Sequence, residues 1–286
     1  MKKNTDDGAK IYTPLTLKLY DWWVLGVSNR LAWGCPTKEH LLPHFLEHLG
    51  NNHLDIGVGT GFYLTHVPES SLISLMDLNE ASLNAASTRA GESKIKHKIS
   101  HDVFDPYPAA LHGQFDSISM FYLLHCLPGN ISTKSCVIRN AAQALTDDGT
   151  LYGATILGDG VVHNSFGQKL MRIYNQKGIF SNTKDSEEGL THILSEHFEN
   201  VKTKVKGTVV MFSASGKNSI QTQHVLAHDV LRHNPNDYSL TGFTGHSISG
   251  AVDVSTRFSN TRYIFQASSN EVSSSVSFIH DVPFHF

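Results

Sequence analysis

The chain has 286 residues, of which 40% are hydrophobic and 17% are charged, and its formal net charge is −3 at pH 7. This composition is typical of a globular protein, and it lacks both the basic surplus of a nucleic-acid binder and an apolar run of about 18 residues that could span a membrane. Residues 1–10 are charged and lead into no apolar signal segment, so we expect a cytoplasmic protein whose partner is a small molecule.

The first 50 residues are expected to form a helical cap that is rich in aromatic side chains. Within residues 37–49 apolar side chains recur at helical spacing, Thr37 stands where a helix N-cap belongs and Gly50 where a helix stops. The aromatic residues that precede this helix are Tyr12, Tyr20, Trp22, Trp23 and Trp33. Aromatic clusters form either plain core or a lid over a ligand, and Tyr20 and Trp23 are the candidates for contact with a substrate.

Residues 51–215 are expected to form the main domain. From about residue 52 to about residue 157 short apolar runs alternate with helical patterns, which is typical of a doubly wound α/β fold. The apolar runs predict five strands, at residues 53–56, 72–76, 95–100, 117–121 and 150–156. Helices are predicted at residues 79–90, 132–145, 166–174 and 187–198. Apolar alternation on both sides of Gly207 predicts a closing hairpin, and an antiparallel pair is common at the edge of a parallel sheet.

Residues 216–286 differ in character from the rest of the chain. They are rich in Ser, Asn, His and Thr, and their apolar residues come in runs too short to predict a helix or a strand. We expect an irregular C-terminal extension and assign it no function. The 18 histidines show no H-E-x-x-H spacing and the three cysteines show no C-x-x-C spacing, so we expect no metal site.

The sharpest motif is D-I-G-V-G-T-G at residues 55–61, in which a predicted strand runs into three alternate glycines. Such a turn needs positive-φ conformations and lets a ligand approach the backbone, and glycine allows both at low energy. Ligands bind at the carboxyl ends of the strands in open α/β sheets. Gly57, Gly59 and Gly61 are therefore candidate ligand-binding residues, the alternative being a tight turn with no ligand.

The G-x-G-x-G spacing and the acidic Asp55 indicate which ligand this turn holds. A dinucleotide-binding turn has the spacing G-x-G-x-x-G and binds a pyrophosphate, which Asp55 would repel. S-adenosylmethionine (SAM) instead carries a protonated amino group, which a carboxylate can bind directly or through water. Asp77 ends the second predicted strand, where a carboxylate can accept both hydroxyls of a ribose. Taken alone, Asp77 has the alternative of a solvated strand-end aspartate.

Further candidates follow the next strands along the chain. Asp102 and Val103 come after the third strand, where they can bind the amino group and cover the ring of an adenine, and an ordinary loop aspartate is the alternative. Leu78 and Phe121 stand at strand ends and are further candidates for contact with the cofactor.

His125 follows the fourth predicted strand. If SAM is bound at the glycine turn, the end of this strand should face the methyl group of SAM. A histidine at this point titrates near neutrality and can remove the proton of a hydroxyl acceptor. The alternative is that His125 caps the loop or packs beneath the acceptor.

These residues resemble the class I SAM-dependent methyltransferase superfamily, well over roughly residues 40–160 and less clearly to about residue 215. The resemblance implies a Rossmann-like, mostly parallel seven-stranded sheet with its last strand antiparallel and helices on both faces. It also implies that the glycine turn and Asp77 bind SAM, that Asp102 and Val103 lie beside the adenine, and that His125 matches a histidine of many small-molecule methyltransferases. The N-terminal part is similar to a YbcY-like group of bacterial methyltransferases, and residues 216–286 depart from the family pattern.

The main prediction is therefore an enzyme that transfers a methyl group from SAM to a small-molecule acceptor. Two alternatives remain open. One is a SAM-binding protein without turnover, and the other is an NAD-binding oxidoreductase, against which Asp55 and the glycine spacing both count.

Overall fold

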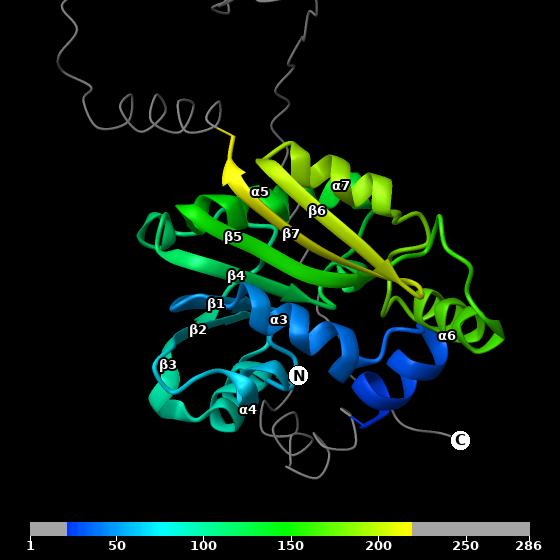
Figure 1. The fold of residues 1–286 in the computed structure, drawn as a ribbon, viewed down its shortest axis with the longest axis horizontal. Coiled ribbons are helices and arrows are strands. Elements are labelled where there is room, and N and C mark those ends of the chain that lie inside the picture. Colours follow the sequence, from blue (N-terminus) through cyan, green and yellow to red (C-terminus); the bar gives the residue numbers. More distant parts are fainter. Residues whose placement is uncertain (1–21, 219–286) are drawn as a thin grey trace, which may run out of the picture. The chain divides into compact units, whose positions relative to one another are not determined.

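The computed structural model describes residues 22–218 (Figure 1). The strands are β1 (Asn52–Ile56), β2 (Leu72–Asp77), β3 (Ile95–Ser100), β4 (Phe115–Phe121), β5 (Leu145–Ile156), β6 (Phe198–Lys206) and β7 (Val209–Lys217). The α-helices are α3 (Leu42–His48), α4 (Glu80–Ala90), α5 (Ser135–Ala144), α6 (Ser165–Gln176) and α7 (Glu187–Ser195). Two π-helical segments precede α3, namely η1 (Trp22–Ala32) and η2 (Thr37–Leu41). Short 3₁₀ helices are η3 (Tyr63–His66), η4 (Glu92–Lys94), η5 (Ala109–Leu111), η6 (Leu124–Cys126) and η7 (Ile131–Lys134).

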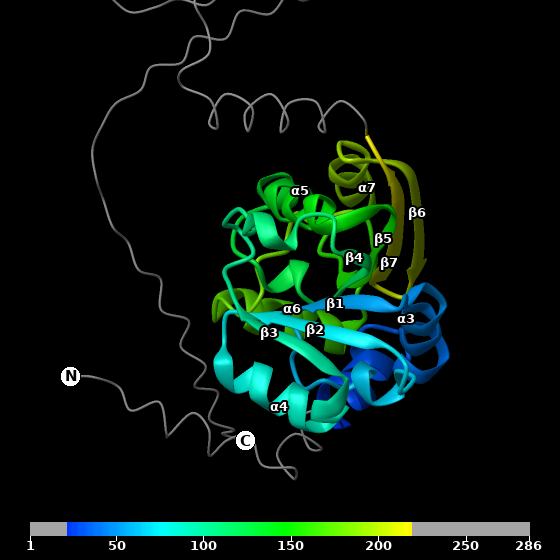
Figure 2. The ribbon, with the colours of Figure 1, turned by 90° about the vertical axis from the view of Figure 1, so that its left-hand side faces the viewer.

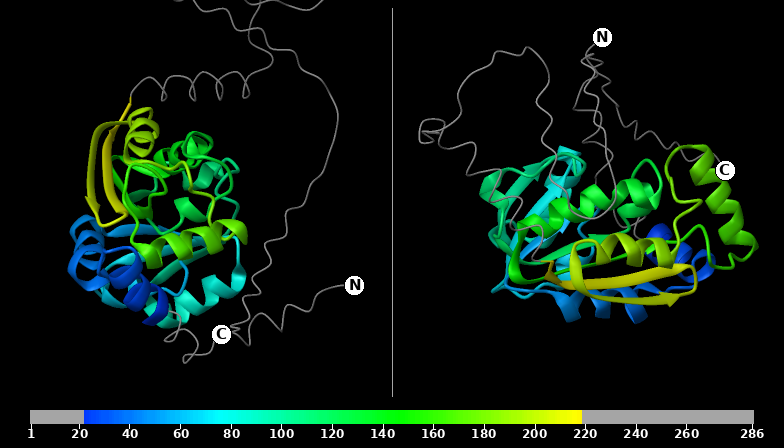
Figure 3. Two further views of the ribbon diagram at one scale, coloured as in Figure 1. Left: turned by 90° about the vertical axis from the view of Figure 1, so that its right-hand side faces the viewer. Right: turned by 90° about the horizontal axis from the view of Figure 1, so that it is seen from above.

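The seven strands form one sheet in the order β3-β2-β1-β4-β5-β7-β6. The first five strands are parallel, whereas β7 runs antiparallel to both of its neighbours, and the β6–β7 hairpin lies at one edge of the sheet (Figure 3). The predicted doubly wound, mostly parallel, seven-stranded sheet with an antiparallel last strand is confirmed. The chain moves outward from β1 to β3 and then from β4 to β5, so the carboxyl ends of β1 and β4 form the switch point where such sheets bind ligands.

Helices cover both faces of the sheet (Figures 1 and 2). The core under α5 and α7 includes Leu54, Ile118, Met120, Val137, Ile138 and Ile193. The core under α3 and α4 includes Phe45, Ile73, Leu75, Ala86, Phe121 and Tyr152. Burial of each large apolar side chain contributes about 1.5 to 3 kcal/mol to the stability of the fold. The two cores therefore hold in place the loops at the carboxyl ends of the parallel strands, which we call the carboxyl edge of the sheet. Within residues 22–218 no helix combines the length and the apolar composition that crossing a bilayer requires.

Local sequence signals predicted one helix end correctly and another wrongly. Asn79 caps α4 with its side-chain oxygen, and Gly91 ends that helix with a φ of 94°. Thr37 is not the N-cap that its position predicted. Its hydroxyl donates to the carbonyl oxygen of Leu25 at 2.5 Å and accepts the side-chain amide of Asn29 at 2.8 Å. Thr37 therefore ties the two π-helical segments of the cap together.

Candidate cofactor and acceptor site

The glycine turn follows β1 and has the left-handed backbone that its sequence predicted. The φ angles of Gly57, Gly59 and Gly61 are 73°, 51° and 70°. A Cβ on Gly61 would lie 2.8 Å from the Cα of Ala86 in α4, and one on Gly57 would lie 2.9 Å from the side chain of Leu123. A Cβ on Gly59 would meet no atom of the described residues within 4 Å. Two of the glycines therefore allow close packing, and Gly59 faces the open side of the turn.

Asp55 lies at the end of β1, immediately before this turn, and is 7% exposed. Ser119 of β4 donates its hydroxyl to Asp55 Oδ1 at 2.5 Å. Burial raises the pKa of Asp55 to about 6, the hydrogen bond from Ser119 opposes the rise, and the charge of Asp77 adds to it. A buried carboxylate is stabilised by a cationic partner, so this position favours a ligand that brings a positive charge.

Asp55 stands at the end of a buried chain of hydrogen bonds between β1 and β4. Ser119 Oγ lies 3.0 Å from Nε2 of His53. On the other side of the ring, Nδ1 lies 2.8 Å from Ser117 Oγ, which accepts the N–H of Gly50. Because Ser119 donates its proton to Asp55, it accepts from His53, which is therefore protonated on Nε2. Burial lowers the pKa of His53 to about 3, so the ring stays neutral and holds the Asp55 carboxylate in one orientation.

Asp77 and Leu78 lie beside the glycine turn. The N–H of Gly57 donates to the carbonyl oxygen of Met76 at 2.8 Å, which brings the ends of β1 and β2 together. Asp77 is half-buried, and its Oδ1 accepts the N–H of Asn79 at 2.9 Å. Leu78 is 50% exposed and offers apolar surface at the same strand end.

The role predicted for the Asp77 carboxylate can be measured directly. We expect Asp77→Ala to weaken SAM binding by about 1 to 3 kcal/mol, the loss that follows removal of a charge-assisted hydrogen-bond partner. Titration calorimetry of the full chain gives this value. Asp77→Asn is the matched control, because its amide oxygen can still accept the Asn79 N–H, and it should lose less affinity. Unchanged affinity in the alanine variant would remove Asp77 from the site.

The loop after β3 is held rigidly around Asp102 and Val103. Asp102 is half-buried, and its Oδ1 accepts the N–H of Phe104 at 3.0 Å. Asn140 of α5 donates its side-chain amide to the carbonyl oxygens of Val103 at 3.0 Å and Asp105 at 2.9 Å. Val103 is 8% exposed and packs into the core, so Asp102 has the more accessible side chain of the pair.

Phe121 and Tyr122 end β4 at the switch point. Phe121 is 8% exposed, and its ring centroid lies 4.6 Å from that of Tyr63, so its side chain supports the site from within the core. Tyr122 has a φ of 61°, and within residues 22–218 it is the one residue other than glycine with a positive φ. Strained backbone of this kind concentrates at functional sites. The Tyr122 hydroxyl donates to Asn29 Oδ1 at 2.9 Å, which ties the cap to the end of β4.

His125 lies in the loop after β4 and is only 2% exposed. Its Nδ1 accepts the N–H of Ile156 at 3.3 Å and lies 3.1 Å from Thr155 Oγ1, so the ring proton is on Nε2. Burial, and to a smaller extent the charge of Lys134, lowers the pKa of His125 to about 3. The prediction that His125 titrates near neutrality is therefore wrong, because the surrounding core, including the Phe180 ring 4.5 Å away, excludes water.

The described part of the cap packs onto the carboxyl edge of the sheet through its aromatic side chains. Trp33 is 2% exposed, and its ring centroid lies 6.0 Å from that of His163 in the loop after β5. Trp23 is half-buried, with its ring 6.4 Å from that of Phe166 in α6. Tyr20 and Tyr12 lie outside the described residues, so the contact of Tyr20 with a substrate stays a prediction.

A pocket of about 410 Å³ opens beyond β5, with a lining that includes His163, Met171, Asn175 and Thr183. The Nε2 of His163 lies 2.9 Å from the carbonyl oxygen of Leu157. Because a carbonyl oxygen only accepts, Nε2 donates and Nδ1 carries the lone pair. This Nδ1 is buried without a hydrogen-bond partner among the described residues, and burial lowers the pKa of His163. Sequence analysis missed His163, because a single histidine in a loop belongs to no spacing pattern.

The side chains at this edge suit SAM. Gly59 leaves the space that an approaching ligand needs, and the buried Asp55 favours a cationic amino group. The Asp77 carboxylate is placed at the neighbouring strand end, where it can accept ribose hydroxyls. A pyrophosphate at the same turn would face the charges of both carboxylates, which favours SAM over a dinucleotide.

Comparison with known proteins agrees with this geometry. Residues 54–151 match the family described as Methyltransferase domain. The protein YbcY of Escherichia coli (strain K12) is 98% identical over 193 residues, which are 68% of this chain and 100% of that protein. The Physcion biosynthesis cluster O-methyltransferase of Aspergillus chevalieri is 44% identical over 212 residues, which are 73% of this chain and 95% of that protein. The solved CMeT domain of the citrinin polyketide synthase shares the fold, with a TM-score of 0.53 and 15% identity over 71% of this chain and 57% of that chain.

The matched residues include the glycine turn, Asp77, Asp102 and His125. The match therefore favours a methyltransferase over an NAD-binding oxidoreductase. The cofactor is SAM, and the substrates that are methylated are small molecules. The chain belongs to the class I SAM-dependent methyltransferases.

Proposed function

We propose that the chain methylates a hydroxyl group of a small-molecule acceptor. The observation that carries this proposal is its 44% identity with an O-methyltransferase over 95% of the length of that relative. The pocket beyond β5 has the size for a small molecule, and its wall combines Met171 with polar side chains that include Gln168 and Arg172.

The residues of this chain have to orient two molecules and keep water away from them. Bound SAM supplies an electrophilic methyl group, and the acceptor oxygen forms the new C–O bond as the C–S bond breaks, with release of S-adenosylhomocysteine and a proton. Asp55 and Asp77 hold the cofactor end of the site. Orientation within a closed site can supply about 7 to 11 kcal/mol of the barrier reduction, so no conspicuous catalytic side chain is required.

A hydroxyl acceptor must lose its proton, and two histidines at the carboxyl edge differ in their ability to take it. His125 has its Nδ1 occupied by the N–H of Ile156, so we assign it a positioning role in the loop after β4. His163 lies in the wall of the pocket and has an unprotonated Nδ1, which is buried beside Gly167 of α6. We assign His163 the role of general base, which requires the ring to turn its Nδ1 toward the acceptor.

Measurements of pH dependence separate these two roles. His163→Gln should lower kcat/KM by about 10²- to 10⁴-fold, the usual contribution of a general base, and should remove the inflection that His163 gives the wild-type profile below pH 6.5. His125→Asn keeps an acceptor near the position of Nδ1 and should keep that inflection. Loss of the inflection in the His125 variant, and its retention in the His163 variant, would return the role of base to His125.

His125→Asn should also change the response of the fold to acid. Folded His125 stays neutral down to about pH 3, whereas the unfolded side chain binds a proton near pH 6.5, so wild-type stability is lost as the pH falls through this window. The variant should lack this loss, which amounts to about 1.4 kcal/mol per pH unit for one proton. Denaturant unfolding of both proteins between pH 4 and pH 7 measures the difference in slope.

The proposed activity is tested by incubating the full chain with SAM and a set of simple phenols and alcohols. Formation of S-adenosylhomocysteine together with an O-methylated product, absent in Asp55→Asn, supports the proposal. Methylation of amines but not of hydroxyls would contradict the choice of oxygen. Tight SAM binding without any methylated product from phenols, alcohols or amines would favour the alternative of a binding protein without turnover.

A further inference from the structure

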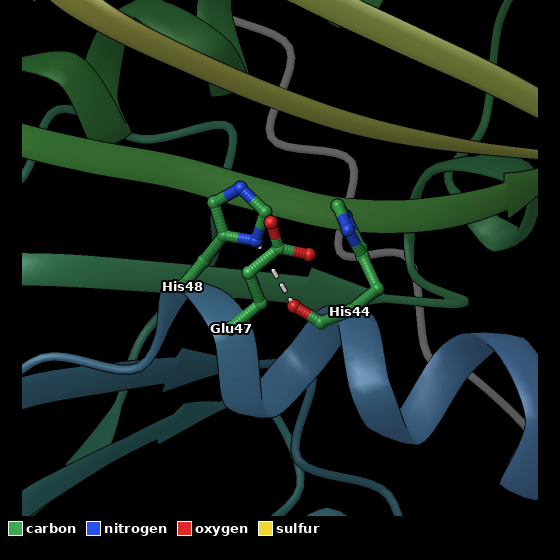
Figure 4. A group of neighbouring side chains, drawn as sticks. All are labelled: His44, Glu47 and His48. Carbon is green, nitrogen blue, oxygen red and sulfur yellow. Dashed lines mark hydrogen bonds between the residues drawn. The ribbon is translucent and has the colours of Figure 1, made fainter.

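Helix α3 carries three metal-binding side chains that the methyl-transfer site does not use. His44, Glu47 and His48 each offer one ligand atom, and these three atoms lie within 4.8 Å of one another. The residues are spaced i, i+3 and i+4, so they share one face of the helix. Figure 4 shows the Glu47 carboxylate between the two imidazole rings. The sequence predicted no metal site because it lacks H-E-x-x-H spacing, whereas these two histidines occur in the order H-x-x-E-H.

Hydrogen bonds to backbone carbonyls prepare both rings for a metal ion. His44 Nε2 lies 3.0 Å from the carbonyl oxygen of Phe212 in β7, and His48 Nδ1 lies 3.0 Å from the carbonyl oxygen of His44. Since a carbonyl oxygen only accepts, each of these nitrogens carries the proton, and the other nitrogen of each ring has the lone pair. Histidines in protein metal sites are oriented in this way, by a carbonyl or carboxylate that binds the nitrogen remote from the metal.

Packing fixes the two rings further and leaves the carboxylate adjustable. The His48 ring stacks on that of Tyr152 at 5.4 Å, and the His44 ring lies 6.1 Å from those of Tyr152 and Phe121. Glu47 is exposed. Ligand atoms about 2.0 to 2.1 Å from a tetrahedral zinc ion are about 3.3 Å apart, so ligand atoms that lie within 4.8 Å of one another must draw closer to bind the ion. The exposed Glu47 side chain can rotate to do so, and the two rings must make up any difference between themselves by small shifts.

We propose that His44, Glu47 and His48 bind a Zn²⁺ ion, with water in the fourth position. Two imidazoles and one carboxylate form a known three-residue zinc set that leaves one coordination position open. Helix α3 leads into the amino end of β1, whereas the methyl-transfer site lies at the carboxyl end of that strand. The ion braces the seven-residue α3 against β5 and β7 and takes no part in methyl transfer. This inference does not rest on the proposed acceptor.

Zinc titration of the chelator-treated full chain tests the proposal. We expect one ion at α3 in the wild type, and at least a tenfold weaker affinity in Glu47→Gln, which keeps the size of an exposed side chain and removes its charge. His48→Asn should weaken binding further. His192→Ala is the matched control, because His192 is 75% exposed on α7 and is also paired at i, i+4 with a glutamate, Glu196. This control should bind zinc as the wild type does.

Two further readouts tie the binding to the fold. Zinc should raise the Tm of the wild type and of His192→Ala, and should leave that of His48→Asn unchanged, because an ion that binds only the folded chain stabilises it. Co²⁺ in place of Zn²⁺ should give a visible absorption band that the Glu47 and His48 variants lack. Equal zinc affinity in the wild type, Glu47→Gln and His48→Asn would overturn the proposal. Failure of every acceptor in the methyl-transfer assay would leave the zinc result unaffected.

Discussion

Asp55→Asn should weaken SAM binding by about 2 to 3 kcal/mol and, at the same time, make the folded chain more stable above pH 7. Affinity falls because the charge that favours a cationic amino group is gone. Stability rises because the wild-type carboxylate is 7% exposed and ionises against both desolvation and the charge of Asp77. The two effects have opposite signs, which separates a binding defect from a folding defect.

The size and the pH window of the stability effect follow from the pKa of Asp55. The folded chain holds this proton with a pKa of about 6, compared with 3.8 for the ordinary carboxyl. Because the folded state binds the proton more tightly, the free energy of unfolding falls as the pH rises from 3.8 to 6, by on the order of 3 kcal/mol in total. Asparagine carries no such penalty. The free energy of unfolding of Asp55→Asn should therefore be higher than that of the wild type above pH 7, and the difference should vanish near pH 4.

Denaturant unfolding at pH 4, 6 and 8, with SAM calorimetry at pH 8, measures both effects. Asp148→Asn is the control, because Asp148 is exposed in β5 and its loss should change neither quantity. Wild-type SAM affinity in Asp55→Asn would show that Asp55 does not bind the cofactor. A variant less stable than the wild type at pH 8 would show that the carboxylate charge is compensated in the folded chain.

Alanine at two glycines of one turn should give two different defects. Gly61→Ala should lower the free energy of unfolding by several kcal/mol, because the new Cβ would lie 2.8 Å from the Cα of Ala86, a backbone atom that cannot move without α4. Gly59→Ala should cost about 1 to 2 kcal/mol, the price of a left-handed alanine, because its Cβ meets no described atom. The same methyl group points into the space left for the ligand, so SAM affinity should fall at least tenfold.

Thermal unfolding and SAM titration of the two variants under identical conditions test this contrast. Gly113→Ala is a suitable control, since Gly113 also has a positive φ, 65°, and open space around its Cβ position, and it lies away from the switch point. It should share the small stability loss of Gly59→Ala and keep wild-type SAM affinity. If Gly59→Ala also kept that affinity, the ligand would not lie against this part of the turn.

Features that depend on neighbouring residues in the chain could be predicted from the sequence. The glycine turn, the Asn79 cap and the strand before Asp77 all have local signals, and each lies where the sequence placed it. The start of β5 was predicted wrongly, because residues 146–149 have the composition of a turn. Leu145 nevertheless pairs with Phe115 across an irregularity in β4, a contact that no local pattern encodes.

Features that depend on burial or on contacts between distant strands could not be predicted. The hydrogen-bond chain from Ser117 through His53 and Ser119 to Asp55 exists because β1 and β4 are neighbours in the sheet. The same limit explains the error for His125. Its position in the chain suggested an accessible base, and only the packed structure reveals that its lone pair binds the N–H of Ile156.

The placement of the tryptophans gives this protein an optical property of its own. The chain has three tryptophans, and all lie within residues 22–33. The sheet contains none, so intrinsic fluorescence reports on the cap while circular dichroism reports mainly on the sheet and its helices. Trp33 is buried and lies 6.0 Å from His163 in the wall of the pocket. An acceptor that enters this pocket would therefore be seen as a change in emission, without any label attached to the chain.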